Sequence, residues 1–166
     1  MFSDEEQQKI TETTRTTQII VAALAAGVFS YLCFVLISSD GEKAEDSDLL
    51  YESLTVAAAA LLAQPFLPGL ITRSGIKSIA QGAAEPEDQV RQICELYTTK
   101  TIVGAAPLEG AAFFSIFNYS MSGNGVSLAV AAALLVAFFF HFPIATTVSD
   151  WVEKQTRAVE ELRSSI

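Results

Sequence analysis

Four apolar runs, each about 20 residues long, dominate this chain of 166 residues. They cover residues 17–38, 49–71, 101–121 and 126–146, and polar segments separate them. At a rise of about 1.5 Å per residue, a helix of this length crosses a hydrocarbon layer of about 30 Å. The runs also lack the alternation of polar and apolar residues that membrane β-strands show. We therefore predict one all-α domain, an integral membrane four-helix bundle made of two transmembrane hairpins.

The composition supports a membrane location and narrows the range of partners. Hydrophobic residues make up 51% of the chain and charged residues only 17%, a balance that is unusual for a soluble domain. The net charge is −9, whereas proteins that bind nucleic acid depend on basic patches that neutralise phosphates. We expect a lipid bilayer, and no nucleic acid, among the partners of this chain.

The distribution of Lys and Arg predicts the orientation in the membrane. Nine of the ten basic residues fall on one side of the predicted bundle: Lys9, Arg15, Arg73, Lys77, Arg91, Lys100, Lys154, Arg157 and Arg163. Only Lys43 falls on the other side, in an acidic loop at residues 39–48. Because cytoplasmic segments carry the excess of Lys and Arg, we predict a bacterial cytoplasmic (inner) membrane protein with both termini in the cytoplasm. Residues 72–100 are then a cytoplasmic loop and residues 147–166 a cytoplasmic tail.

The segments outside the runs have local patterns of their own. The connection Ser122-Gly123-Asn124-Gly125 consists of residues that tolerate positive φ, so a tight turn is expected there. Further upstream, Val90, Ile93, Cys94 and Tyr97 recur at i, i+3, i+4 and i+7. That spacing fits either an amphipathic helix on the inner membrane surface or an extension of the third span.

The tail is expected to form a cytoplasmic helix. Asp150 is the predicted N-cap, because Glu153 follows three residues later and completes a capping pattern. A short apolar stripe follows the cap and consists of Val152, Val159, Leu162 and Ile166. Trp151 is expected to lie at the membrane interface, where Trp is enriched.

Glu109 is the only charged residue of the third run. A charged carboxylate in the middle of a bilayer costs about 3 kcal/mol. By residue count Gln64 lies at a similar depth and His141 nearer the cytoplasm, so the three side chains form a predicted polar patch. Glu109 then serves as a proton or cation site, or else as a neutral, hydrogen-bonded group that only packs the helices. Asn118, near the outer end of the run, is expected to be interfacial.

The sequence contains no motif typical of an enzyme active site or a metal site. There is no Ser/His/Asp arrangement, no His-Glu-x-x-His zinc helix and no phosphate-binding loop. The chain has one His, and neither Cys33 nor Cys94 belongs to a metal-binding pattern. We therefore expect no enzymatic activity, no cofactor and no metal.

The segment from Gly104 to Phe114, an Ala-rich helix with the carboxyl of Glu109, resembles the second helix of the rotary ATPase proteolipid, subunit c. The preceding Ala84-Glu85-Pro86-Glu87 is similar to the polar loop of that family. This resemblance implies that Glu109 carries a transported proton or sodium ion.

A second resemblance covers most of the predicted second hairpin. The segments at residues 97–102, 108–114 and 142–151 are similar to those of bacterial four-span membrane proteins. That resemblance implies a shared fold and no particular activity. The sequence thus predicts a small accessory or structural membrane protein whose partners are a second copy or another membrane protein. Proton or cation translocation through Glu109 is the alternative.

Overall fold

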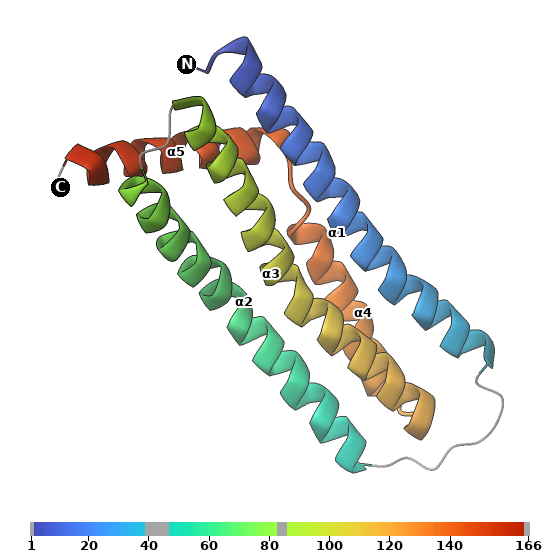
Figure 1. The fold of residues 1–166 in the computed structure, drawn as a ribbon. Helices are drawn as coiled ribbons and strands as arrows, with labels where there is room; N and C mark the ends of the chain where they lie inside the picture. The colour runs from blue at the N-terminus through green and yellow to red at the C-terminus, as the bar shows by residue number, and fades with distance from the viewer. Residues whose placement is uncertain (1, 39–46, 83–85, 165–166) are drawn as a thin grey trace. The chain divides into compact units, whose positions relative to one another are not determined.

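The computed structural model describes residues 2–38, 47–82 and 86–164. These residues form five helices in the order α1 (Asp4–Ser38), α2 (Ser47–Gln81), α3 (Pro86–Ser122), α4 (Gly125–Phe140) and α5 (Ala145–Ser164), and no strand occurs among them (Figure 1). The all-α prediction is confirmed for this part of the chain. Three helices are long and apolar enough to cross a membrane, and a fourth candidate consists of α4 together with α5. Lys43 and the rest of the acidic loop up to residue 46 lie outside the described residues, and the last two residues of that predicted loop belong to α2.

Local capping explains where α1 and α4 begin. The hydroxyl of Ser3 accepts a hydrogen bond from the amide of Glu6, and the carboxylate of Glu6 accepts one from the amide of Ser3. This reciprocal pair is a capping box. At the start of α4, the side chain of Asn124 accepts a hydrogen bond from the amide of Val126 at 2.9 Å. Gly123, immediately before it, has a φ of 70°, which confirms the predicted tight turn.

The predicted fourth run is divided into two helices. The helix α4 ends at Phe140, and α5 begins at Ala145. The break contains Pro143, which lacks an amide hydrogen and disfavours helical geometry in the residue before it. The prediction that Asp150 caps the tail helix was wrong, because Asp150 lies inside α5. The first hydrogen bond of the new helix joins the amide of Val148 to the carbonyl of Ile144.

The chain divides into two compact units, and α1, α2 and α3 each contribute to both. Unit 1 comprises Met1–Ile20, Phe66–Val103 and Pro143–Ile166, and unit 2 comprises Val21–Pro65 and Gly104–Phe142. Each unit has its own cluster of buried apolar side chains.

The core of unit 1 contains the periodic residues of the predicted cytoplasmic segments. Val90, Ile93, Cys94 and Tyr97 are all buried there, in company with Val148, Val152 and Val159 of α5. Because residues 86–122 form one uninterrupted helix, the periodic segment is an extension of the third run and not a separate surface helix.

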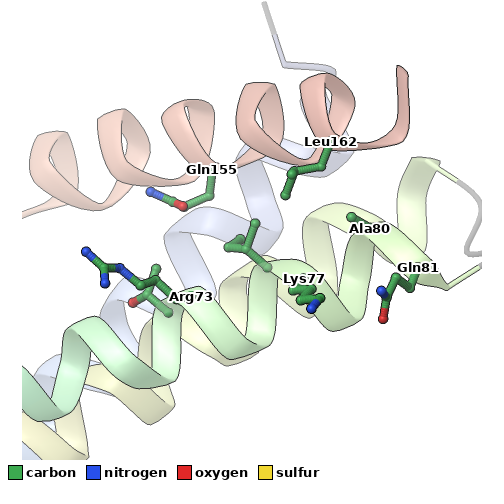
Figure 2. Close-up of a pocket in the computed structure, with 8 residues that line it drawn as sticks. Arg73, Lys77, Ala80, Gln81, Gln155 and Leu162 are labelled. Atoms are coloured by element: carbon green, nitrogen blue, oxygen red, sulfur yellow. The ribbon is translucent and has the colours of Figure 1, made fainter. Parts of the chain in front are cut away.

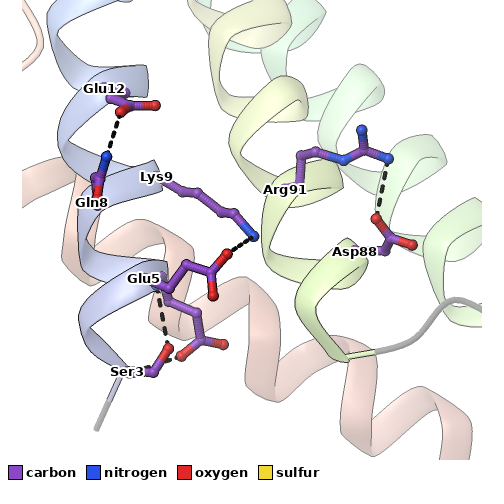
Figure 3. Close-up of polar contacts among 8 residues, drawn as sticks. Ser3, Glu5, Gln8, Lys9, Glu12, Asp88 and Arg91 are labelled. Carbon is purple, nitrogen blue, oxygen red and sulfur yellow. Dashed lines mark hydrogen bonds and ion pairs between the residues drawn. The ribbon is translucent and has the colours of Figure 1, made fainter.

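The ion pairs of unit 1 are local to single helices. Figure 3 shows Lys9 paired with Glu5 on α1 at 3.5 Å and Arg91 paired with Asp88 on α3 at 3.2 Å. On α5, Arg157 pairs with Glu153 in the same way. Exposed pairs of this kind contribute about 0.3–0.5 kcal/mol each. None of these three ion pairs joins one helix of unit 1 to another.

Candidate functional site

Unit 2 has an apolar exterior, and its interior combines an apolar core with several buried polar side chains. Ser53, Ser115, Asn118 and Ser127 are buried, while large apolar side chains such as Phe34, Leu62 and Phe139 are exposed by 63%, 67% and 77%. The buried positions of unit 2 are mostly apolar, as in water-soluble domains, but its exposed surface is also rich in large apolar side chains. This apolar surface is the feature of the structure on which a functional assignment depends most.

Asn118 is the centre of a network of buried polar groups in unit 2. Its amide nitrogen donates to the backbone carbonyl of Leu49 at 3.0 Å and to the hydroxyl of Ser53 at 2.9 Å. The hydroxyl of Ser53 lies 3.3 Å from that of Ser127. The network therefore joins α2, α3 and α4.

Asn118 is buried, with only 1% of the residue exposed, and its interfacial depth stays a prediction. The periodic pattern of α3 contained the signal that would have shown this burial. Leu108, Ala111, Ser115 and Asn118 recur at intervals of three or four residues, and all four are buried. The polar character of the last two obscured the shared face.

The structure places Glu109 at the edge of the core of unit 2. Its neighbour Leu108 is fully buried, whereas Glu109 is partly exposed and Gly110 is exposed. Within the described part of the chain, the Glu109 carboxyl makes no hydrogen bond and no ion pair. The hydrogen-bonded packing role considered for Glu109 therefore has no visible partner among the described residues.

Gln64 and His141 are both partly exposed, and no hydrogen bond joins either of them to Glu109 in the described residues. The His141 backbone amide bonds to Phe138 and caps α4, while its ring nitrogen Nδ1 lies 2.8 Å from the carbonyl of Ala137. Both of these partners belong to α4, the helix that His141 caps. The polar patch of Gln64, Glu109 and His141 stays a prediction.

A separate cluster in unit 1 surrounds Lys100. Its ammonium nitrogen lies 4.7 Å from the ring centre of Tyr97 and 4.1 Å from that of Trp151, and the two rings meet edge to face at 5.2 Å. Lys100 precedes the predicted third span, and burial lowers the pKa of its ammonium group to about 8. The ring faces attract the cation and oppose that change. This contact between α3 and α5 has no signal in the sequence, because residue 151 is remote from residue 100.

Cys94 is buried in the same unit, on the face of α3 that packs in the core. Burial raises the pKa of its thiol, and a hydrogen bond with Thr13 acts in the opposite direction. A buried thiol with a raised pKa is a poor nucleophile, so Cys94 is a packing residue. Among the described residues, no group of three or more His, Cys, Asp or Glu side chains is placed to hold a metal ion.

Comparison of the chain with known protein families, curated proteins and solved structures finds no match.

Proposed function

We propose that this chain is a small multi-pass membrane protein with an accessory or structural role. The observation that supports the proposal best is the apolar exterior of unit 2, together with the hydrogen-bonded polar side chains inside it. In hydrocarbon, outward-facing apolar side chains are favourable, and polar side chains form hydrogen bonds inside the bundle.

The positions of the exposed apolar residues support the same proposal. Apart from Leu162, every exposed large apolar side chain in the described residues lies within the four predicted spans. An exposed apolar surface this extensive is rare on soluble monomers and marks contact with a membrane or with a protein partner. Its restriction to the runs of spanning length favours the membrane.

The proposed location is the bacterial cytoplasmic membrane, with both termini in the cytoplasm. The charge distribution carries this part of the proposal, because nine of the ten basic residues lie on the same side of the predicted spans. In this role a second copy, or another membrane protein, would bind the chain within the bilayer or at its cytoplasmic segments.

Membrane extraction and cysteine labelling test the proposal together. The native cysteines are replaced by Cys33→Ser and Cys94→Ser, and one reporter is added, either Gly125→Cys in the exposed turn or Ser164→Cys in the exposed tail. We expect the protein to stay in the membrane pellet after alkaline carbonate. In spheroplasts, an impermeant maleimide should label Gly125→Cys and not Ser164→Cys. Release by carbonate would overturn the membrane assignment, and the opposite labelling would overturn the orientation.

Proton or cation translocation through Glu109 is the second candidate function. It is favoured by one observation: the carboxyl is partly exposed and has no partner among the described residues. A carboxyl that exchanges protons or binds a cation needs such access, whereas a purely structural carboxyl in a membrane needs a hydrogen-bonding neighbour.

Infrared titration of the protein in lipid distinguishes the two roles of Glu109. A protonated carbonyl band that disappears reversibly between about pH 6 and 9, and that is absent in Glu109→Gln, would show a carboxyl in contact with water. Ion flux into vesicles containing the wild type and not the variant would then establish translocation. A band that does not change over this range would remove the second candidate and leave the structural role.

A further inference from the structure

A groove of about 500 Å³ lies in unit 1 between the last turns of α2 and the helix α5. The buried lining residues Ile76 and Ala80 are apolar, whereas the exposed ones include Arg73 and Lys77. Eight residues line the groove: Thr72, Arg73, Ile76, Lys77, Ala80, Gln81, Gln155 and Leu162. Figure 2 shows Gln155 and Leu162 projecting from α5 toward the face of α2 that carries Arg73 and Lys77. The groove is large enough for a small-molecule headgroup.

The charge of the groove differs from that of the chain. The chain has 19 acidic and 10 basic residues, yet the described residues that line the groove include two cations and no carboxylate. Arg73 and Lys77 are exposed and one helical turn apart, and neither makes an ion pair with another described residue. Two unpaired cations beside neutral amide and hydroxyl groups are suited to an anionic ligand with phosphate and hydroxyl groups.

The position of the groove along α2 indicates the kind of anion. Arg73 follows the predicted span 49–71 by two residues and Lys77 by six, which places them about 3 and 9 Å beyond its end. The polar headgroup layer of a bilayer is about 5–8 Å deep on each side. On the same face of α2 and within unit 1, Phe66 and Leu70 are exposed by 68% and 62%. These two apolar side chains lie next to the two cations along α2. The acyl chains and the phosphate of a lipid follow one another in the same order.

We propose that this groove binds the headgroup of an anionic phospholipid from the inner leaflet. Arg73 and Lys77 bind the phosphate, Gln155 binds the polar part of the headgroup, and Phe66 and Leu70 contact the acyl chains. The inference rests on the proposed membrane location. It adds a ligand class and a site to that location.

The test uses the full-length protein in nanodiscs that contain phosphatidylcholine and a minor fraction of phosphatidylglycerol. After gentle transfer to neutral detergent, native mass spectrometry counts the two lipids that remain bound. We expect the wild type to retain phosphatidylglycerol in preference to phosphatidylcholine. The double substitution Arg73→Gln/Lys77→Gln should reduce this preference by roughly thirtyfold, or about fivefold for each lost charge.

Two variants separate the groove from general electrostatic attraction. Arg15→Gln/Lys154→Gln removes the same charge outside the groove, and both of these residues are exposed. This control variant should retain phosphatidylglycerol in preference to phosphatidylcholine, as the wild type does. Arg73→Lys/Lys77→Arg exchanges the two cations and should keep most of this preference. An equal loss in the control, or an unchanged preference in Arg73→Gln/Lys77→Gln, would overturn the proposal.

Failure of the lipid site and failure of the membrane assignment give different results. If the wild type enters pure phosphatidylcholine nanodiscs but shows no preference for phosphatidylglycerol, only the groove proposal is overturned. If it does not enter lipid at all, the membrane assignment is overturned as well. Soluble glycerol 1-phosphate serves as a competitor. Displacement of bound lipid by this compound at millimolar concentration would show a site for free phosphates and would contradict the lipid assignment.

Discussion

Arg163 joins three segments of unit 1 through one guanidinium group. It donates to the side chain of Gln89 at 2.9 Å and to the backbone carbonyls of Ile79 and Gly82 at 3.3 and 3.1 Å. These carbonyls are at and just beyond the end of α2, where the last carbonyls of a helix lack their usual i+4 amide donors. A cation at this position also interacts favourably with the helix dipole.

Replacing Arg163 with Ala should therefore destabilise the protein. Hydrogen bonds from charged groups contribute about 1.5–3 kcal/mol, and because Arg163 is partly exposed we expect a loss of about 2 kcal/mol. Urea unfolding in detergent measures it. The control is Arg157→Ala, which removes only an exposed pair within α5 and should cost at most about 0.5 kcal/mol. Equal effects of the two substitutions would contradict the bridging role.

Asn118 has the corresponding role in unit 2. In Asn118→Ala the carbonyl of Leu49 and the hydroxyl of Ser53 lose a donor. Interhelical hydrogen bonds in membranes average about 0.6 kcal/mol each, so we expect a loss of about 1 kcal/mol. Steric trapping or urea unfolding in mixed micelles measures this change. The neighbouring Phe117 is exposed, and Phe117→Leu should leave the stability nearly unchanged. A larger effect of Phe117→Leu than of Asn118→Ala would rule out the proposed network.

At the scale of the elements, the turn between α3 and α4 depends on the backbone conformation of one glycine. Gly123 has a φ of 70°, and Gly123→Ala should cost about 1 kcal/mol because side chains disfavour this region. Gly125 begins α4, and a methyl group there would meet no atom within 4 Å. Gly125→Ala should therefore leave the stability unchanged or raise it slightly. Thermal unfolding of the two variants gives the sign of each effect, and a loss of stability in Gly125→Ala would contradict this account.

The elements that were predictable from the sequence are those with a local cause. The long apolar runs indicated the helices, Gly123 indicated the turn, and the spacing of Val90, Ile93 and Tyr97 indicated their shared buried face. The start of α5 was not predicted, because Asp150 and Glu153 formed a plausible cap while Pro143 determined the actual break.

Contacts between remote residues could not be derived from the sequence. The stacking of Lys100 against Trp151 and the bonds from Arg163 to the end of α2 depend on which helices pack together. The arrangement of the candidate site could not be derived from the sequence for the same reason. Depth along a helix can be counted for Gln64, Glu109 and His141, but the direction of each side chain depends on the faces that the helices bury.

At the scale of the whole molecule, the two units should differ in hydrogen exchange. Amides in hydrocarbon have no access to water, so in nanodiscs we expect peptides from residues 21–38 and 104–122 to stay protected. Peptides from residues 2–20 and 145–164 should exchange at the rates of local opening. Mass spectrometry of exchanged peptides measures both, with the urea-unfolded chain as the reference for full exchange. Equal protection of the two groups would argue against a bilayer around unit 2.

The division of the chain into units also has a consequence for its synthesis. The segments of unit 2 end at Phe142, whereas unit 1 needs its final segment, Pro143–Ile166. Val148, Val152 and Val159 of that segment belong to the core of unit 1. At about 5–20 residues per second, a ribosome completes the parts of unit 2 on the order of seconds earlier. During that interval the side chains that later pack against these valines, including Ile93 and Tyr97, are exposed on the nascent chain. A chaperone can bind them there.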